Sequence, residues 1–448
     1  MRSVSGVRGI VGADLTTDVV RRYAAAYGAF VRARGGRRVG LGRDSRASGP
    51  ALYAAAADAL AAAGVEVVEM GMVPTPTVQL AVEDLPLDGG IVVTASHNPI
   101  EWNALKFVGP GGRFLTRPDA DALFAIADGA GVGPDGPTGP RSRDDGAVRR
   151  HLGRVLGLPW LDVQAIRARR FRVALDCVRG AGATIMPALF EALGCEVRAI
   201  NLEPDGAFPR EPEPIPEHLG ELSALVRASG ADVGMAVDPD VDRLAIVDES
   251  GRPIGEDYTL AFAVRAVLPH LRGPVVTNLS TSLAVDDAAK AFGLAVERVP
   301  VGEANVVERM IARGAVIGGE GNGGVILPAV HLGRDAPVAA ALALAALART
   351  GLSVSAIVNG GRRYVIVKVK LDRPTGALDA VYAALRRRWP DATADVQDGL
   401  RLAWGDRWIH VRPSGTEPVV RVIAEAPTDA DAQGLVEDGR RALLTMGA

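Results

Sequence analysis

An α/β fold of three related domains plus a C-terminal α+β domain is predicted from three observations, and we expect these domains to lie around a central cleft. The chain has 448 residues, which is more than one hydrophobic core usually supports. Through most of its length, apolar strand-like runs alternate with helix-like runs, which predicts βαβ units and mixed, mostly parallel sheets. The last segment instead has several short strands and a closing helix, which favours helices packed on one face of an antiparallel sheet.

Four domains are expected, and each is defined by its predicted elements. The boundaries are predicted at residues 1–140, 150–252, 253–358 and 362–448. In the first domain the expected elements are helices at 19–34 and 51–63 and strands at 38–41, 65–70 and 91–94. The stretch 130–143 is rich in Gly, Pro and Asp, so we expect a surface loop near a boundary.

The remaining domains continue this alternation. The second is expected to hold strands 171–176, 197–201, 233–237 and 244–247 with helix 183–193. The third is expected to hold strands 275–278, 296–300 and 316–318 with helix 283–292. The fourth is expected to hold strands 364–371, 400–404, 408–411 and 419–425 with helices 378–388 and 429–444. The repeated order of strand, helix and strand-to-loop indicates that the first three domains are related.

Composition and charge exclude several classes of protein. The chain is 48% hydrophobic and 23% charged, with a formal net charge of −3, so it lacks the overall basic charge that attracts nucleic acid. No apolar run approaches the roughly 20 residues of a membrane span, and the N-terminal segment lacks the apolar core of a signal peptide. Two cysteines, Cys177 and Cys195, cannot staple so long a chain, which favours a reducing compartment. A cytoplasmic protein without nucleic-acid or membrane partners is predicted.

Residues 92–99 end an apolar strand in a small polar turn, where the hydroxyl of Ser96 stands next to the imidazole of His97. Pro99 has no N–H to donate and ends any regular ladder. A serine at the exposed end of a buried strand can act as a nucleophile or carry a covalent group. The alternative is a turn whose polar side chains only cap backbone groups. This segment alone supports the two interpretations equally.

The segment 238–243 carries three carboxylates at alternate positions, Asp238, Asp240 and Asp242. Alternate residues of an extended segment project to one side, where unpaired carboxylates repel one another. A hard divalent cation relieves this repulsion, and carboxylate oxygens suit Mg²⁺. A solvated acidic turn is the alternative, and it is disfavoured because buried apolar strands are expected on both sides of the segment.

Two further loops offer groups that suit a phosphorylated sugar. The Gly-rich segment 318–324 contains Glu320 and Asn322, whose acceptor and donor groups are of the kind that bind sugar hydroxyls. The segment 412–418, with Arg421 beyond it, combines arginine, hydroxyls and a glycine turn into a nest that suits phosphate. Taken alone, the first is a common type of loop and the second is equally well a plain hairpin turn.

Two cationic residues accompany these loops. Arg8 lies in a Gly-flanked segment before the first helix, and Lys106 follows the serine turn closely enough to share its cleft. The alternatives are a surface arginine and a lysine that extends along the surface. Lysine is scarce in this chain compared with arginine, which favours a specific need for an ammonium at position 106.

Taken in order, the four loops resemble those of the α-D-phosphohexomutase superfamily, over essentially the whole chain. The resemblance implies that Ser96 is phosphorylated and that one Mg²⁺ per chain is bound by Ser96, Asp238, Asp240 and Asp242. It implies a proton-transfer role for Lys106, which we favour, or for His97. It implies that the transferring group is held by Arg8 and Arg243.

The resemblance also implies how the sugar and its phosphate are bound. Glu320 and Asn322 would read the sugar. The substrate phosphate would be held by Arg412, Ser414, Gly415, Thr416 and Arg421. Many members have serine and then histidine where this chain has Asn322 and Gly324, and many phosphomannomutases and phosphoglucomutases have histidine at the position of Glu303. At these positions the sequence resembles archaeal-type phosphoglucosamine mutases most.

The implied activity is a mutase reaction. Phospho-Ser96 would donate its phosphoryl group to a hexose phosphate, and the hexose 1,6-bisphosphate intermediate would turn over and return its other phosphate. Glucosamine 6-phosphate to glucosamine 1-phosphate is the expected conversion, with phosphoglucomutase or phosphomannomutase activity as the alternative. A metal-dependent sugar phosphatase and a non-catalytic phosphosugar-binding protein are alternatives of another class. A hexose phosphate is the expected partner, and the chain is expected to be a monomer or a homodimer.

Overall fold

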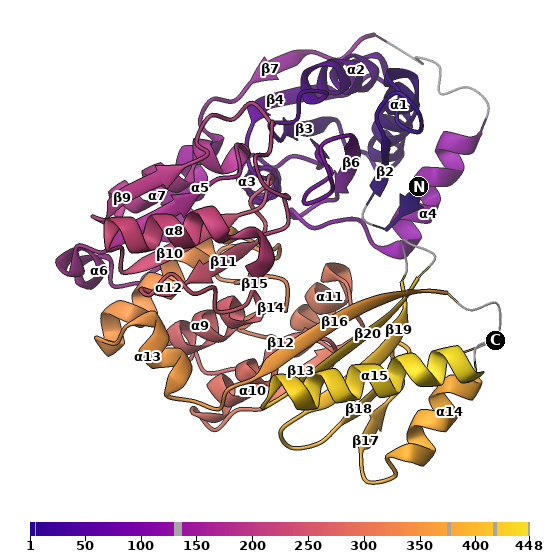
Figure 1. Ribbon diagram of the computed structural model, residues 1–448. Helices are drawn as coiled ribbons and strands as arrows, with labels where there is room; N and C mark the ends of the chain where they lie inside the picture. The colour runs from indigo at the N-terminus through magenta and orange to yellow at the C-terminus, as the bar shows by residue number, and fades with distance from the viewer. Residues whose placement is uncertain (5, 130–136, 374–377, 415–418, 447–448) are drawn as a thin grey trace. The chain divides into compact units, whose positions relative to one another are not determined.

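The computed structural model describes the whole chain except residues 5, 130–136, 374–377, 415–418 and 447–448 (Figure 1). Two compact units are formed by segments that are not contiguous in sequence. The first unit comprises Met1–Thr259 and Gly323–Ser355, and the second comprises Leu260–Asn322 and Ala356–Ala448. The four predicted domain boundaries are a finer division than these two units and stay predictions.

The first unit contains a seven-stranded sheet in the order β1-β2-β6-β5-β3-β4-β7. Its strands are β1 (Arg2–Ser3), β2 (Gly6–Ile10), β3 (Arg38–Arg43), β4 (Glu66–Met72), β5 (Gly89–Val93), β6 (Trp102–Val108) and β7 (Arg141–Arg143). The pairs β3–β4, β3–β5 and β4–β7 are parallel, whereas β6 is antiparallel to β5 and β2. The sequence-based expectation of a loop over 130–143 is wrong at its end, because Arg141–Arg143 pairs with β4 as a strand.

Helices cover this sheet because their apolar faces are buried on it. They are α1 (Thr17–Ala33), α2 (Gly49–Ala62), α3 (Thr75–Asp84), α4 (Arg117–Asp128) and α5 (Ala147–Leu156). Helix α1 begins after Thr16, whose hydroxyl accepts the backbone N–H of Val19, a cap that satisfies one of the free donors of the first turn. Tyr27 and Phe30 of α1 are almost completely buried in the core.

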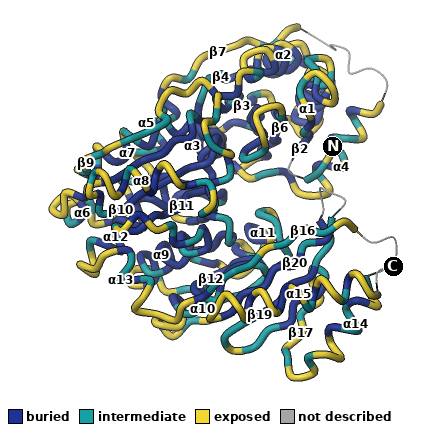
Figure 2. Tube along the Cα trace, in the orientation of Figure 1, coloured by how far each residue is buried: buried dark blue, intermediate teal, exposed yellow. Residues whose placement is uncertain are grey.

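The second sheet of this unit has the order β11-β10-β8-β9. Its strands are β8 (Arg172–Asp176), β9 (Glu196–Ile200), β10 (Val233–Val237) and β11 (Leu244–Val247). The same unit also contains α6 (Val163–Arg169), α7 (Met186–Ala192), α8 (Gly220–Ser229), β15 (Gly324–Ile326) and α12 (Ala336–Thr350). Strands β8, β9 and β10 run parallel, and β11 is antiparallel to β10. Every residue of β10 and β11 is buried (Figure 2), so the turn between them starts and ends in the protein interior.

The second unit contains parallel strands in the order β13-β12-β14 and a separate antiparallel sheet in the order β16-β20-β19-β18-β17. The parallel strands are β12 (Val275–Asn278), β13 (Val296–Val299) and β14 (Ile317–Glu320), with helices α9 (Asp257–Val267), α10 (Leu283–Lys290), α11 (Glu303–Arg313) and α13 (Val354–Asn359). The antiparallel strands are β16 (Val365–Asp372), β17 (Thr393–Asp395), β18 (Leu400–Ala403), β19 (Trp408–Pro413) and β20 (Val419–Ala426), with helices α14 (Asp379–Arg388) and α15 (Asp429–Met446).

The core of the antiparallel sheet lies between its strands and helices α14 and α15, where Leu402, Val411, Val422 and Leu385 are buried together. The change from mixed, mostly parallel sheets to an antiparallel sheet confirms the predicted fold class. None of the helices in the described part of the chain combines the length and apolarity that a membrane crossing requires.

Candidate active site

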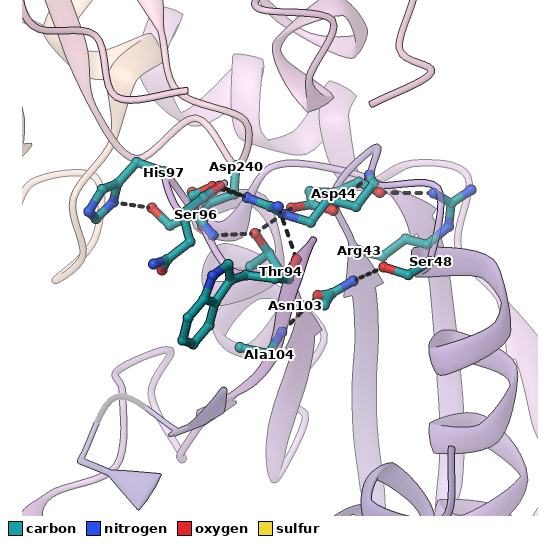
Figure 3. A network of polar contacts seen from close by, with 12 residues as sticks. Arg43, Asp44, Ser48, Thr94, Ser96, His97, Asn103, Ala104 and Asp240 are labelled. Atoms are coloured by element: carbon teal, nitrogen blue, oxygen red, sulfur yellow. Dashed lines mark hydrogen bonds and ion pairs between the residues drawn. The ribbon is translucent and has the colours of Figure 1, made fainter. Parts of the chain in front are cut away.

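Ser96 lies in the turn directly after β5, and its backbone is left-handed, with φ of 51°. This conformation costs a residue with a side chain roughly 1–2 kcal/mol, so neighbouring contacts must hold it. Only 5% of the residue is exposed. The hydroxyl donates a hydrogen bond to Asp238 Oδ2 at 2.9 Å. It also lies 3.3 Å from His97 Nδ1 (Figure 3). The serine turn of one sheet therefore meets the acidic segment of the other.

The acidic segment fills the connection between β10 and β11. Asp238, Asp240 and Asp242 are fully or almost fully buried, and their ligand oxygens all lie within 4.8 Å of one another. Asp238 Oδ1 accepts the backbone N–H groups of Asp242 and Arg243 at 3.1 and 3.2 Å. This leaves Asp238 Oδ2 on the side of Ser96.

Cationic and hydroxyl donors hold one oxygen of each of the other two carboxylates. Asp240 Oδ2 accepts Lys106 Nζ and Thr75 Oγ1, both at 2.6 Å. Asp242 Oδ2 accepts Arg334 Nη2 at 2.6 Å. Within the described residues, Asp240 Oδ1 and Asp242 Oδ1 have no hydrogen-bond partner although they are buried. Buried acceptors without partners are costly, and here two of them lie in one cluster.

This donor set fits a hard divalent cation. Burial raises the pKa of Asp238 well above its usual range, and the neighbouring carboxylates of Asp242 and Asp240 raise it further, so a third negative charge in this cluster is unfavourable without a cation. Mg²⁺ prefers carboxylate oxygens in a compact octahedral arrangement. The two buried oxygens without partners, together with Asp238 Oδ2 and the hydroxyl of Ser96, are the atoms that such an ion would use.

Lys106 lies on β6 opposite Val92 of β5 and is only 6% exposed. The alternative of a lysine extended along the surface is therefore wrong. Burial opposes the charged form of Lys106, but Asp240 and Asp242 outweigh it and raise the pKa of this lysine. Lys106 is thus an ammonium fixed on the acidic segment. Its proton-transfer role stays a prediction.

Arginines surround the imidazole of His97. Arg8 contacts the serine turn, with its Nη1 donating to Asn98 Oδ1 at 3.0 Å. Arg243 Nη1 donates to Glu213 Oε1 at 2.9 Å, and His97 Nε2 lies 3.9 Å from the same oxygen. Desolvation, followed by the charges of Arg243 and Arg8, holds the pKa of His97 well below its usual range. The imidazole beside Ser96 is therefore neutral.

The sequence did not point to Arg334, and it could not place His331, which belongs to a buried group with His151 and Asp335. His331 and His151 place their Nε2 atoms 2.9 and 2.7 Å from the same oxygen of buried Asp335. Asp335 caps α12 by accepting the backbone N–H of Val338. Its neighbour Arg334 is thereby placed on the acidic segment. No local pattern marked Arg334 or His151, because their partners Asp242 and Asp335 are 92 and 184 positions away in the chain.

In the second unit, the predicted sugar loop begins at the end of β14. Glu320 is 4% exposed, and its Oε1 accepts Asn278 Nδ2 at 2.9 Å and the backbone N–H of Gly302 at 3.1 Å. Its other oxygen lies 3.5 Å from Asn322 Nδ2. The carboxylate is thus fixed by neighbouring donors at the carboxyl ends of the parallel strands.

The predicted phosphate loop follows β19. Arg412 and Arg421 are opposite one another on β19 and β20, and Ser414 donates its backbone N–H to Val419 O at 2.8 Å. Arg412 Nε donates to Asp398 Oδ2 at 2.7 Å, and the same oxygen accepts the backbone N–H of Val301 at 3.1 Å. Gly415 and Thr416 lie outside the described residues. The structure therefore links the described part of this loop to the 301–302 segment, which contacts Glu320.

The comparison with known protein families covers both units. Models of the phosphoglucomutase/phosphomannomutase family match along the whole chain: alpha/beta/alpha domain I at residues 2–131, domain II at 152–251, domain III at 255–364 and the C-terminal domain at 366–442. The chain belongs to this family. The resemblance drawn from the four loops is thus confirmed, and with it the prediction of a phosphotransferring mutase, an isomerase.

Individual members of the phosphoglucomutase/phosphomannomutase family are similar over nearly their full length. A probable phosphoglucosamine mutase of Methanopyrus kandleri is 36% identical over 440 residues, covering 97% of this chain and 95% of that protein. A phosphoglucomutase/phosphomannomutase of Thermococcus kodakarensis is 35% identical over 453 residues, covering 98% and 97%. A crystal structure of a family protein from Burkholderia thailandensis is similar with a TM-score of 0.84 and 31% identity, covering 99% of this chain and 98% of that one.

Proposed function

We propose that this protein is a phosphohexomutase that moves a phosphoryl group between the 6- and 1-positions of a hexose phosphate through phospho-Ser96. The observation that carries this proposal is the 2.9 Å hydrogen bond from Ser96 Oγ to Asp238 Oδ2. It places the one strained, buried hydroxyl of the serine turn against a cluster of three carboxylates. A phosphoserine carries about −1.5 to −2 charges at neutral pH, and such a group needs a counter-charge at this position.

One Mg²⁺ per chain is the counter-charge that we propose, held by Ser96 Oγ, Asp238, Asp240 and Asp242. When bound, the ion would neutralise charge on the phosphorylated serine and its leaving oxygen. Arg8 donates to Asn98 of the same turn, and Arg243 donates to Glu213, whose carboxylate also lies near His97; both arginines would orient the transferring group. Phosphoryl transfer depends mainly on such positioning and charge neutralisation.

The reaction balances without any further reactant. A free hydroxyl of the hexose phosphate attacks the phosphorus of phospho-Ser96, a new O–P bond forms and the bond from phosphorus to Ser96 Oγ breaks. The proton of the attacking hydroxyl is released, and Ser96 Oγ takes up a proton. Lys106, which we favour, and His97, whose Nδ1 lies 3.3 Å from Ser96 Oγ, are the two candidates for moving these protons. The hexose 1,6-bisphosphate then reorients and returns its other phosphate to Ser96 by the reverse steps.

Glucosamine 6-phosphate and glucosamine 1-phosphate are the substrates that we propose. Glu303 is the first residue of α11 and directly follows Gly302, whose N–H binds Glu320. Two carboxylates in neighbouring segments favour a sugar with a cationic amino group over a neutral sugar. The similarity to an archaeal protein named as a probable phosphoglucosamine mutase supports this choice. Glucose and mannose phosphates are the alternative, and the similarity to a phosphoglucomutase/phosphomannomutase favours testing them.

The test follows the fate of phosphate by ³¹P NMR. The protein is incubated with Mg²⁺, a trace of hexose 1,6-bisphosphate and, in separate reactions, glucosamine 6-phosphate, glucose 1-phosphate or mannose 1-phosphate. We expect interconversion of the 6- and 1-phosphates, fastest for glucosamine, with no accumulation of inorganic phosphate. Release of inorganic phosphate as the main product would identify a phosphatase. Absence of any conversion would identify a binding protein. We further expect a monomer or a homodimer, and light scattering of the same sample measures the oligomeric state. We also expect the protein to be located in the cytoplasm.

A further inference from the structure

Arg46 lies beneath the serine turn and is completely buried. Its guanidinium has five N–H groups, and each has a partner. Nη2 donates to the backbone oxygens of Ser96 and Asn98 at 2.7 and 2.6 Å. Nη1 donates to those of Pro99 and Trp102 at 2.6 and 3.0 Å. Nε donates to Asp44 Oδ2 at 3.1 Å. One side chain therefore fixes the course of the turn from Ser96 to the start of β6.

A second contact to Ser96 runs through Thr94 and Asp44 (Figure 3). Thr94 Oγ1 donates to Asp44 Oδ2 at 2.7 Å, since a carboxylate can only accept. The same Thr94 oxygen then accepts the backbone N–H of Ser96 at 2.9 Å. Asp44 is itself fixed, because its Oδ1 accepts the backbone N–H of Arg46 at 3.0 Å. The N–H and the C=O of Ser96 are thus both bound by one buried group of side chains.

These two contacts act on a backbone that would not stay in place alone. Ser96 is left-handed, with φ of 51°, a conformation that non-glycine residues keep only where the surroundings determine it. Its peptide groups on both sides are held by Thr94 and Arg46. The orientation of these peptides sets the direction of the side chain, and here Oγ points at Asp238 Oδ2.

We propose that Thr94, Asp44 and Arg46 are positioning residues that keep Ser96 in its left-handed conformation and aim its hydroxyl at the acidic segment. The inference rests on the proposed function of Ser96 as phosphoryl carrier. None of the three side chains needs to touch the substrate. They act through the Ser96 backbone, so their loss misplaces the reacting oxygen while the groups that bind the sugar phosphate are unchanged. A misplacement of about 1 Å can lower a rate about 100-fold.

The experiment compares two variants of Thr94 with a matched control. Thr94→Val keeps the shape and removes the hydroxyl, whereas Thr94→Ser keeps the hydroxyl. Ser48→Ala is the control, because Ser48 Oγ accepts a hydrogen bond from buried Asn103 Nδ2 at 2.9 Å in the same region (Figure 3), and neither residue belongs to the serine turn. Each protein is measured for melting temperature, kcat, KM and the single-turnover rate at which phospho-Ser96 loses its label to hexose phosphate.

We expect Thr94→Val to lower kcat and the single-turnover rate about 100-fold with KM changed less than about threefold. Thr94→Ser should restore most of the rate. Ser48→Ala should lower the melting temperature about as much as Thr94→Val while kcat stays within about twofold of the parent. Equal rates for Thr94→Val and Ser48→Ala would overturn the inference, as would an effect of Thr94→Val on KM alone.

Arg46→Lys provides the same comparison if Thr94→Val does not fold. Lysine keeps the charge but has three donors, too few for the four backbone oxygens and Asp44. We expect the single-turnover rate to fall at unchanged KM, and an unchanged rate would overturn the inference.

Measurements on the parent protein distinguish failure of the proposed function from failure of the positioning role. If the parent carries no transferable phosphate on Ser96, the proposed function fails. If the parent turns over and the Thr94 and Arg46 variants match it, only the positioning role fails.

Discussion

Ser96 and Asp238, which are 142 positions apart in the chain, are joined by a hydrogen bond of 2.9 Å between Oγ and Oδ2. This contact connects the turn after β5 with the turn after β10, two loops from different sheets of the same unit. It follows that the properties of Ser96 depend on the acidic segment and on the ion that we propose to bind there. The following predictions test that dependence and the roles of other residues.

Replacement of Asp238 by asparagine should weaken Mg²⁺ binding. The change removes one of the three charges that face the proposed site and leaves the size of the side chain unchanged. We expect the affinity measured by isothermal titration calorimetry to fall at least about 10-fold. Asp145→Asn, at an exposed aspartate bound to Arg143, is the control and should bind Mg²⁺ like the parent. Equal affinities for the two variants would contradict the assignment of Asp238 as a ligand.

Removal of Mg²⁺ should destabilise the protein. Three buried carboxylates repel one another without the ion. Burial and the neighbouring carboxylates of Asp242 and Asp240 hold the pKa of Asp238 well above its usual range. An ion at 100 times its Kd adds about 2.7 kcal/mol to the free energy of unfolding. The melting temperature should therefore rise when Mg²⁺ is added after treatment with EDTA. The rise should be lost in Asp238→Asn, and a rise that persists there would place the stabilising ion elsewhere.

The acidic segment was predictable from sequence because its chemistry is local. Asp238, Asp240 and Asp242 alternate between two apolar strands, so spacing alone indicated a cation. The support around it was not predictable. Arg46 binds backbone oxygens, which carry no residue-specific signal, and these oxygens come close only after β3, β5 and β6 have paired.

Arg334 is a similar case, since it reaches Asp242 from the segment before α12, 92 positions away. Lys106 was singled out as a candidate, but its place on a strand was not expected. Strand β6 begins at Trp102, only a few positions after Ser96. The polar residues of the serine turn gave no indication that a strand follows so soon. Residues whose partners are distant in sequence are the ones that sequence patterns leave out.

Substitution of Glu303 by glutamine should reduce the preference for an amino sugar. The carboxylate at the start of α11 is proposed to attract the ammonium group of glucosamine phosphate, and a charge-assisted contact contributes roughly 1.5–3 kcal/mol. We expect kcat/KM for glucosamine 6-phosphate to fall about 10-fold while that for glucose 1-phosphate changes little. Glu308→Gln, an exposed position on the same helix, is the control. An equal loss with both sugars would show that Glu303 does not read the amino group.

Both cysteine thiols should resist alkylation in the native protein. Burial raises the pKa of Cys195 to about 12 and that of Cys177 further, so neither forms the reactive thiolate near neutral pH. A thiol whose pKa is higher in the folded state stabilises the fold below its unfolded pKa, about 8.5, and this contribution is lost as the pH rises toward 12.

The measurement is the rate of iodoacetamide labelling at each site, followed by mass spectrometry between pH 7 and 9. Labelling should be slow throughout this range and fast in urea. Labelling of native protein at the rate of the urea-unfolded chain would contradict the raised pKa of these thiols.

The most direct test of the central claim is to follow phosphate onto Ser96. The protein is incubated with ³²P-labelled hexose 1,6-bisphosphate and Mg²⁺, and the labelled peptide is identified by mass spectrometry. We predict one phosphoryl group, on the peptide that contains Ser96, which is chased off by added hexose phosphate. Ser96→Ala should take up no label and show no turnover while still binding hexose phosphate. Label on another residue, or normal turnover by Ser96→Ala, would contradict the proposed mechanism.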